Sequence, residues 1–276
     1  MLSIIIPAHN EQAYLGTCLA SLMAQEGATG PVEIIVVANG CTDATVAVAK
    51  KFSGQAKARL WGFTVLDIPE GGKPGALDHG DAAASGGARM YLDADITCGL
   101  GLLAQIQAVL DRPEPAYASG RLVVAPAKSW VTKRFADLWV RLPFLTQDVP
   151  GAGLFAVNAA GRGKWQSFPR IISDDGYVRL LFQPHERHLV NATYLWPMAE
   201  GFATLVRVRR RQDVGIQEIA EKFPSLPANE GKADLRPTDH LRLFLAAPLN
   251  YLVYVTVIVT VRFGGRRNYA AWSRGR

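Results

Sequence analysis

The apolar residues of the first 95 positions gather in four short runs, and a segment with helical spacing follows each of the first three. The runs cover residues 2–6, 32–37, 63–68 and 90–92. Short, nearly continuous apolar runs are typical of strands that are buried on both faces of a parallel sheet. Strands that alternate with helices indicate βαβ units. The pattern therefore predicts an α/β fold with a Rossmann-like, mostly parallel sheet flanked by helices.

Polar side chains follow the carboxyl ends of these predicted strands. Most come directly after an apolar run, and one lysine lies in the glycine-rich loop 70–75. The set comprises His9, Asn10, Glu11, Asn39, Lys73, Asp93 and Asp95. Ligands of open α/β sheets bind in the crevice outside the carboxyl ends of the strands. We therefore expect a nucleotide diphosphate, bridged by a metal ion, at this edge of the sheet.

Asp93 and Asp95 lie one residue apart at the end of the fourth run, so both carboxylates point to the same side of a strand. Two like charges at this distance repel each other unless a cation lies between them. Carboxylate oxygens suit Mg²⁺ or Mn²⁺, which are typically held by one or two carboxylates together with substrate phosphates. A structural interpretation stays open on this pattern, in which a strand-end Asp caps the next helix and Asp95 is solvated.

Several features of the sequence argue against other classes of protein. The first strand is followed neither by GxGxxG nor by a Walker A motif, which disfavours a dehydrogenase and a P-loop NTPase. Three cysteines without metal-ligand spacing are typical of reduced thiols in a cytosolic protein. The short apolar start at residues 2–6 predicts a first strand and not a signal peptide. No zinc finger or RNA-binding signature is present, so we expect no nucleic-acid partner.

Four segments resemble, in order and spacing, the successive motifs of family 2 glycosyltransferases. They are Ile-Ile-Ile-Pro-Ala-His-Asn-Glu at 4–11, Val-Val-Ala-Asn-Gly-Cys-Thr-Asp at 36–43, Gly-Lys-Pro-Gly-Ala-Leu at 72–77 and Asp-Ala-Asp at 93–95. The resemblance implies a GT-A fold, a nucleotide-diphosphate sugar as donor, and Mn²⁺ or Mg²⁺ as cofactor. Asn39 stands where the family often has an acidic residue, so the identity of the nucleotide base is not predicted.

The same resemblance assigns roles to individual residues. It implies that the base and ribose are held by Pro7, Ala8, His9, Asn10, Glu11 and Asn39. Lys73 is expected near the nucleotide. Asp93 and Asp95 are expected to form the DxD motif, which binds the metal and the diphosphate.

A second pair of carboxylates, Asp174 and Asp175, precedes an apolar helical pattern. Ser173 or Asp174 can cap that helix. The pair also resembles the family's Glu-Asp motif, which implies that Asp175 is the catalytic base and that Asp174 stands in place of the Glu. Inverting sugar transfer needs one base to take the proton of the acceptor hydroxyl. A hydrolytic glycosidase would place two carboxyls around one bond and would not explain the nucleotide-like half.

The segment 205–212 contains four arginines. One interpretation is a solvated helix face, which charged runs usually form. The other is a clamp on the diphosphate, because the guanidinium group binds phosphate oxygens bidentately. We predict Arg209 and Arg210 as donor-binding residues on the second interpretation. The family's processive Gln-x-x-Arg-Trp motif is absent, which favours non-processive transfer.

The last part of the chain combines positive charge with an apolar segment. Residues 236–276 contain seven arginines and one acid, which accounts for the net charge of +6. The polar residues 218–236 predict a linker. The uncharged segment 243–261 has 19 residues, close to the length of a membrane-spanning helix. A re-entrant or interface-lying helix and a soluble packing helix are the alternatives. We expect a peripheral or single-pass protein at the cytoplasmic face of the cell membrane.

Together these patterns predict an inverting, metal-dependent glycosyltransferase that moves a sugar to a hydroxyl acceptor in envelope glycan or glycolipid synthesis, a lipid-linked acceptor included. We expect a nucleotide-sugar-binding half (1–110), an acceptor-binding and catalytic half (111–235) and a basic, apolar tail (236–276). The alternatives are a catalytically silent nucleotide-sugar-binding or scaffold protein of the same fold, and a nucleotidyltransferase. The latter would need a glycine-rich, arginine-bearing loop after the first strand.

Overall fold

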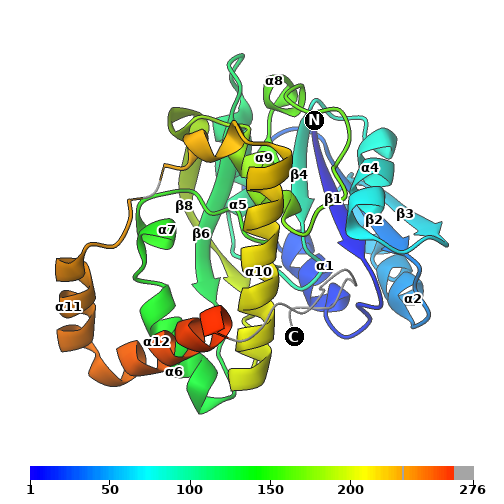
Figure 1. Cartoon of the computed structure of the whole chain (residues 1–276). Coiled ribbons are helices and arrows are strands. Elements are labelled where there is room, and N and C mark those ends of the chain that lie inside the picture. Colours follow the sequence, from blue (N-terminus) through cyan, green and yellow to red (C-terminus); the bar gives the residue numbers. More distant parts are fainter. Residues whose placement is uncertain (232, 264–276) are drawn as a thin grey trace.

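The structure, a computed structural model, describes residues 1–231 and 233–263 and is built around one mixed sheet of eight strands (Figure 1). The strands are β1 (Leu2–Ala8), β2 (Val32–Asn39), β3 (Gly62–Ile68), β4 (Ala88–Leu92), β5 (Thr97–Cys98), β6 (Tyr117–Val124), β7 (Leu154–Val157) and β8 (Arg187–Trp196). The larger helices are α1 (Leu15–Met23), α4 (Lys73–Ala83), α5 (Leu102–Leu110), α6 (Trp130–Trp139), α9 (Asp174–Leu180), α10 (Phe202–Lys222), α11 (Pro237–Ala246) and α12 (Pro248–Phe263). Shorter helices are α2 (Thr45–Lys50), α3 (Ser53–Ala58), α7 (Pro143–Thr146), α8 (Ala159–Arg162), η1 (Pro184–Glu186) and η2 (Leu226–Asn229).

The first four long strands form the parallel part of the sheet, in the order β3-β2-β1-β4. The central strand β1 is buried on both faces: Ile4 and Ile6 face one core, while Ile5 packs with Leu77 of α4 in another. A Cβ at Gly80 of α4 would lie 2.4 Å from the Ile5 side chain, so glycine lets α4 approach the sheet closely. This confirms the predicted α/β fold.

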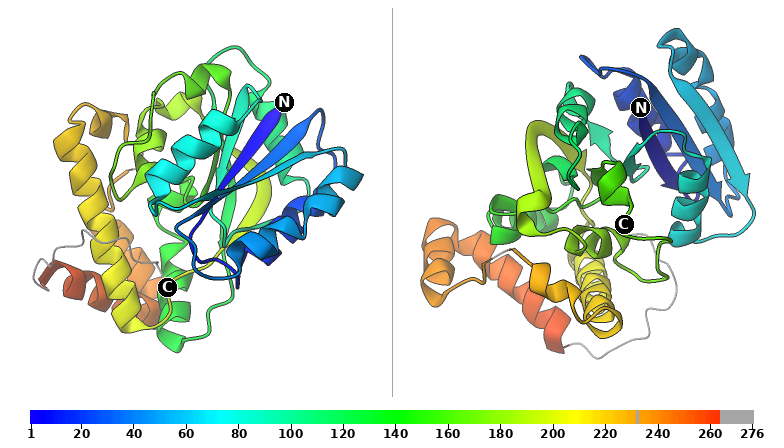
Figure 2. Two further views of the ribbon diagram at one scale, coloured as in Figure 1. Left: turned by 90° about the vertical axis from the view of Figure 1, so that its right-hand side faces the viewer. Right: turned by 90° about the horizontal axis from the view of Figure 1, so that it is seen from above.

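The sheet continues beyond β4 with antiparallel pairing to β7, which in turn pairs with β6. Strand β8 then lies parallel to β6, and β5 closes the edge. The sheet curls along this direction (Figure 2), and helices flank it. Strands from residues 1–110 and from residues 111–235 therefore share one sheet.

A separate apolar layer joins α6, α10 and α12 beside this second part of the sheet. Phe135 and Leu138 of α6, Leu205 of α10, and Val257 and Val261 of α12 are buried together there. The ring of Phe135 lies 5.4 Å from that of Tyr254 on α12. The C-terminal helices are thus part of the folded body up to residue 263.

The structure differs from two sequence predictions near the C-terminus. The apolar segment 243–261 does not form one helix, because it is divided between α11 and α12 at Ala247, the residue before Pro248. Among the described residues, the structure contains no helix whose length and apolarity would suffice to cross a membrane. The predicted linker 218–236 is partly helical, since α10 runs on to Lys222 and η2 follows. The end of the predicted basic tail, 264–276, lies outside the described residues.

Candidate active site

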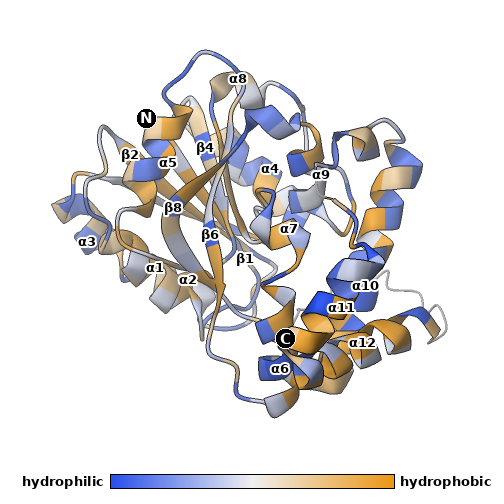
Figure 3. Ribbon diagram, turned by 90° about the vertical axis from the view of Figure 1, so that its left-hand side faces the viewer, coloured by the Kyte–Doolittle hydropathy of each residue, from blue (hydrophilic) through white to orange (hydrophobic). Residues whose placement is uncertain are grey.

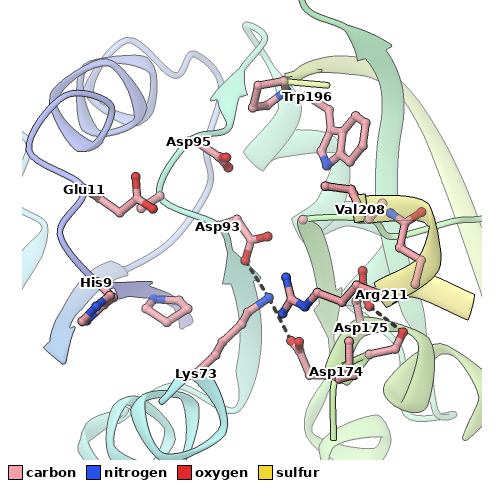
Figure 4. Close-up of a pocket in the computed structure, with 18 of the residues that line it drawn as sticks. His9, Glu11, Lys73, Asp93, Asp95, Asp174, Asp175, Trp196, Val208 and Arg211 are labelled. Atoms are coloured by element: carbon pink, nitrogen blue, oxygen red, sulfur yellow. Dashed lines mark hydrogen bonds and ion pairs between the residues drawn. The ribbon is translucent and has the colours of Figure 1, made fainter. Parts of the chain in front are cut away.

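The candidate site lies where the strand order of the sheet reverses. Strands β2 and β3 extend from one side of β1, whereas β4 pairs with its other side. Loops that leave the carboxyl ends of β1 and β4 therefore diverge and open a crevice. The crevice is lined by predicted site residues of both halves of the chain (Figure 4), namely Pro7, His9, Glu11, Asn39, Lys73, Asp93, Asp95, Asp174 and Asp175.

Two asparagines connect the loops on the nucleotide side of the crevice. The Asn39 amide donates to the Ala8 carbonyl at 3.0 Å, and its oxygen accepts the Gly72 N–H at 3.0 Å. It thereby ties β1 and β2 to the start of α4. Asn10, with φ 54°, accepts the Thr42 N–H at 2.7 Å. Ala8 and Asn10, both predicted to contact the nucleotide, support these loops and are not among the residues that line the crevice.

Lys73 stands at the first turn of α4 and joins the two acidic pairs. Its ammonium group lies 2.8 Å from Asp93 Oδ1 and 3.0 Å from Asp174 Oδ2 (Figure 4). Burial acts to lower the pKa of Lys73, but the charges of Asp174 and Asp93 outweigh it and raise that pKa above its usual value. Lys73 is therefore a permanent cation between carboxylates that come from opposite halves of the chain.

A glycine turn determines the position of Asp93. The Asp93 N–H donates to the Gly153 carbonyl at 2.8 Å. A Cβ at Gly153, which has φ +71°, would lie 3.4 Å from the Asp93 carboxylate, and one at Gly151 would collide with the Tyr117 hydroxyl at 1.7 Å. The turn thus comes close to the DxD segment because it carries no side chains at these positions.

The donor set at Asp93 and Asp95 fits a divalent metal. Both side chains line the crevice, carboxylate oxygens are hard ligands, and Asp93 already attracts the cation of Lys73. Within residues 1–231 and 233–263, no cluster of three or more His, Cys, Asp or Glu side chains is placed to hold a metal. A metal bound here would take only one or two protein carboxylates and would leave positions for phosphate oxygens.

The second acidic pair begins α9, and its two members differ in environment. Asp174 is buried against Lys73, and burial raises its pKa above the usual value against the pull of the lysine. Asp175 is half-buried, lines the crevice and accepts the Gly176 N–H at 2.8 Å. Ser173 occupies the N-cap position without capping, because its hydroxyl donates to Asp175 at 3.1 Å instead. The predicted cap by Ser173 or Asp174 is therefore wrong, because Ser173 makes no capping hydrogen bond and Asp174 is already the first residue of the helix.

The helix α10 presents a different arginine to the crevice from those predicted. Arg210 donates to the Thr260 carbonyl of α12 at 2.7 Å, and Arg209 pairs with Gln212 and Asp213 of its own helix. Arg211 lines the crevice. Burial lowers its pKa, while Asp174, Asp175 and Asp93 act to raise it, which places the guanidinium in the field of all three carboxylates (Figure 4).

The crevice residues that were not predicted from the sequence include Arg211, Gln212 and Trp196. The first two had a signal, since Val208, Arg211 and Gln212 follow the i, i+3, i+4 spacing of one helix face. Trp196 ends β8 and stacks on Trp139 of α6, with ring centroids 5.4 Å apart. Its position depends on the pairing of β8 with β6, which the local sequence does not reveal.

Residues 3–161 match the family described as glycosyl transferase family 2. The chain belongs to this family. Among curated proteins, it is 29% identical over 213 residues to the 4,4'-diaponeurosporenoate glycosyltransferase of Staphylococcus aureus (strain MRSA252), and 28% identical to that of strain USA300. Each alignment covers 73% of this chain and 49% of the relative. The family 2 chain thus spans about half the length of the curated relatives it matches.

Solved structures show that this family 2 chain has a GT-A fold. The mannosyltransferase PcManGT from Pyrobaculum calidifontis, solved with GDP-Man and Mn²⁺, superposes with a TM-score of 0.60 at 18% identity, over 96% of this chain and 76% of that one. S. aureus TarS 1–349, solved with UDP-GlcNAc, gives a TM-score of 0.54 at 15% identity, over 95% of this chain and 92% of that one.

Proposed function

We propose that this protein is an inverting, metal-dependent glycosyltransferase that moves a sugar from a nucleotide-diphosphate sugar to a hydroxyl acceptor. The observation that carries the proposal is the convergence of two acidic pairs, Asp93 with Asp95 and Asp174 with Asp175, on one crevice at the reversal point of the sheet. The first pair would bind the metal and the donor diphosphate, and the second would take part in removing the proton of the acceptor. The mannosyltransferase neighbour, solved with GDP-Man and Mn²⁺, supports the donor and metal part of this proposal.

Asp93 and Asp95 would hold Mn²⁺ or Mg²⁺ together with the donor diphosphate. When bound, the metal offsets the negative charge that grows on the departing nucleotide diphosphate. Lys73 adds a positive charge beside Asp93, and Arg211 is the arginine of α10 that lines this crevice. His9, Glu11 and Asn39, at the ends of β1 and β2, line the part of the crevice where the base and ribose would bind.

Asp175 would take the proton of the acceptor hydroxyl as the hydroxyl oxygen attacks the anomeric carbon. Of the two carboxylates of α9, Asp174 is held by Lys73, whereas Asp175 is less buried and lines the crevice. A base must reach the proton that it removes. Asp174, through Lys73, would position the donor side of the site.

We further propose that the protein acts at the cytoplasmic face of the cell membrane, in the synthesis of an envelope glycan or glycolipid with a lipid or lipid-linked acceptor. The positive charge of residues 236–276 supports this location, because the cytoplasmic leaflet carries anionic lipids.

Calorimetric titration of the whole protein with UDP-, GDP- and dTDP-sugars, with Mn²⁺ or with EDTA, tests the donor half of the proposal. We expect one nucleotide class to bind in Mn²⁺ and much more weakly in EDTA. Asp93→Ala and Asp95→Ala should remove this metal dependence, whereas the exposed Asp111→Ala is the matched control and should retain it. Unchanged Mn²⁺-dependent affinity in both site variants contradicts the metal assignment. Donor binding without any sugar transfer or donor hydrolysis would favour the silent binding protein.

A further inference from the structure

The helices α11 and α12 carry an apolar surface that the folded body leaves exposed. On α12, exposed positions recur at Leu249, Leu252, Thr256, Val259 and Phe263, with intervals of three and four residues that define one helix face. The opposite face of α12 is buried against α6 and α10 through Val257 and Val261. The helix is therefore apolar on its exposed face as well as on the face that packs against α6 and α10, and Figure 3 shows hydrophobic colours along it.

The helix α11 extends this surface. None of its residues is buried, although it contains Leu241, Phe244 and Leu245, and Leu245 is 68% exposed. Phe244 and His240 contact the ring of Tyr251, and His240 Nδ1 lies 3.0 Å from the Tyr251 hydroxyl. These contacts hold α11 against α12. Figures 1 and 2 place the pair at the edge of the molecule away from β2 and β3.

The hydroxyl groups on the exposed face of α12 need no water. Thr256 donates to the Leu252 carbonyl at 2.8 Å, and Thr260 donates to the Thr256 carbonyl at 2.7 Å. Both polar groups are therefore satisfied inside the helix, and the face can leave water without losing hydrogen bonds. An exposed apolar surface of this extent on a soluble body is typical of an interaction site.

The positive charge next to this surface favours an anionic bilayer over a second copy of the chain as the partner. In the described part of this region, the side chains of Arg236 and Arg242 are 73% and 79% exposed, Arg262 is also exposed, and α11 and α12 contain one acidic residue, Asp239. Two copies of the chain that met through this surface would bring these like charges together. An anionic bilayer instead attracts basic residues and accepts apolar side chains below its headgroups.

We propose that α11 and α12 form a membrane-docking surface that lies in the plane of an anionic lipid bilayer, with Leu245, Leu249, Leu252 and Phe263 inserted at the headgroup boundary. This inference does not depend on the proposed reaction, because it concerns a surface away from the crevice. Docking would hold the catalytic body beside a lipid acceptor without a membrane-spanning segment in the described residues.

Vesicle flotation of the whole protein tests the proposal. We expect the chain to float with phosphatidylcholine vesicles that contain phosphatidylglycerol, and to float less with phosphatidylcholine alone or at high salt. Leu245→Gln/Leu252→Gln should weaken binding to the anionic vesicles by about tenfold or more, since two apolar side chains no longer leave water. Arg242→Gln/Arg262→Gln should weaken it by about fivefold for each charge.

The matched control is Leu100→Gln/Ile216→Gln, which changes two side chains of similar exposure outside α11 and α12. This control should float as the unchanged protein does, and circular dichroism should show that all variants are folded. The proposal is overturned if the unchanged chain does not bind anionic vesicles, or if Leu245→Gln/Leu252→Gln binds them equally well. A dimer in light scattering that this variant dissociates would also overturn it, because the surface would then join two copies of the chain.

Discussion

Lys73 joins the two acidic pairs to which the proposed function gives separate chemical roles. It contacts Asp93, which follows β4, and Asp174, which begins α9. One lysine and two aspartates therefore share a partly buried site. The positive charge of Lys73 reduces the repulsion between the two carboxylates. The environments of Asp174 and Asp175 differ, since Asp174 is buried and paired with Lys73, whereas Asp175 is half-buried.

Asp175→Asn should lower the rate of sugar transfer by about 10²- to 10⁴-fold, the usual contribution of a general base. Donor affinity should change little, because the proton moves only in the transition state. Asp174→Asn should affect donor affinity more than rate, since Lys73 loses one of its two partners. Single-turnover rates and calorimetric affinities for both variants provide the measurement. A larger rate loss for Asp174→Asn than for Asp175→Asn would show that Asp174, and not Asp175, is the base.

Arg211→Ala should weaken binding of the nucleoside diphosphate by about tenfold, because a charge-assisted contact to phosphate is lost. Arg210→Ala is the matched control on the same helix. Its side chain donates to the Thr260 carbonyl near the end of α12, so its loss should instead lower the free energy of unfolding by about 1 kcal/mol. Equal losses of nucleotide affinity in the two variants would contradict the orientation of α10 in which Arg211 lines the crevice and Arg210 contacts α12.

Glu33 provides a pH-dependent contribution to stability at the opposite end of the sheet. Burial opposes its ionisation, but hydrogen bonds from Ser3 at 2.6 Å and from Ser85 and Gly86 outweigh it and lower its pKa. A carboxyl whose pKa is lower in the folded state stabilises the fold above its unfolded pKa of about 4.3. That stabilisation is lost as the pH falls through the folded pKa.

Glu33→Gln should therefore be less stable than the unchanged protein at pH 7. The difference should narrow below about pH 4.3 as the wild-type carboxyl takes up its proton. Urea unfolding of both proteins from pH 3 to pH 8 provides the measurement. A difference that does not depend on pH would show that the hydrogen bonds of Glu33 do not require its charge.

The turn that joins α7 to β7 connects local backbone geometry to the site. Gly151→Ala should destabilise the protein by about 1 kcal/mol for the left-handed backbone and by a further 1–3 kcal/mol for the contact with Tyr117. Gly30→Ala is the matched control, because Gly30 has φ +75° and open space around it. Chemical unfolding should show a larger loss for Gly151→Ala. The same loss of unfolding free energy in both variants would mean that the turn shifts away from Tyr117 without cost.

The C-terminal helices complete the apolar core beside α6, which makes a simple truncation a poor test of membrane binding. Removal of residues after 236 would expose Phe135, Leu138 and Leu205 to water. Val257→Ala should cost about 2 kcal/mol of unfolding free energy, because it leaves a cavity in this core. Val259→Ala, at an exposed position of the same helix, should cost less than about 0.5 kcal/mol. Equal costs would show that α12 does not pack as described.

The sequence by itself determined the parallel part of the sheet and the group of polar residues at its carboxyl edge. Continuous apolar runs identify strands buried on both faces, and polar residues at their carboxyl ends must meet at one edge. For this reason the sequence predicts that His9, Asn39, Lys73, Asp93 and Asp95 meet, and the structure brings them to one crevice. This prediction needs only local sequence, because each of these residues follows its strand closely along the chain.

Only the tertiary structure decided the parts of the site that depend on long-range packing. Trp196 reaches the crevice through the pairing of β8 with β6, and Lys73 contacts Asp174 from a helix a hundred residues away in sequence. The choice of Arg211 over Arg209 and Arg210 depends on the rotation of α10 about its axis, which α12 fixes through Arg210. Likewise, the apolar residues of 243–261 look alike in sequence, and only packing against α6 and α10 separates a buried face from an exposed one. The hydrophobic effect favours the burial of any apolar side chain, but it is not directional and does not determine which surface covers that side chain.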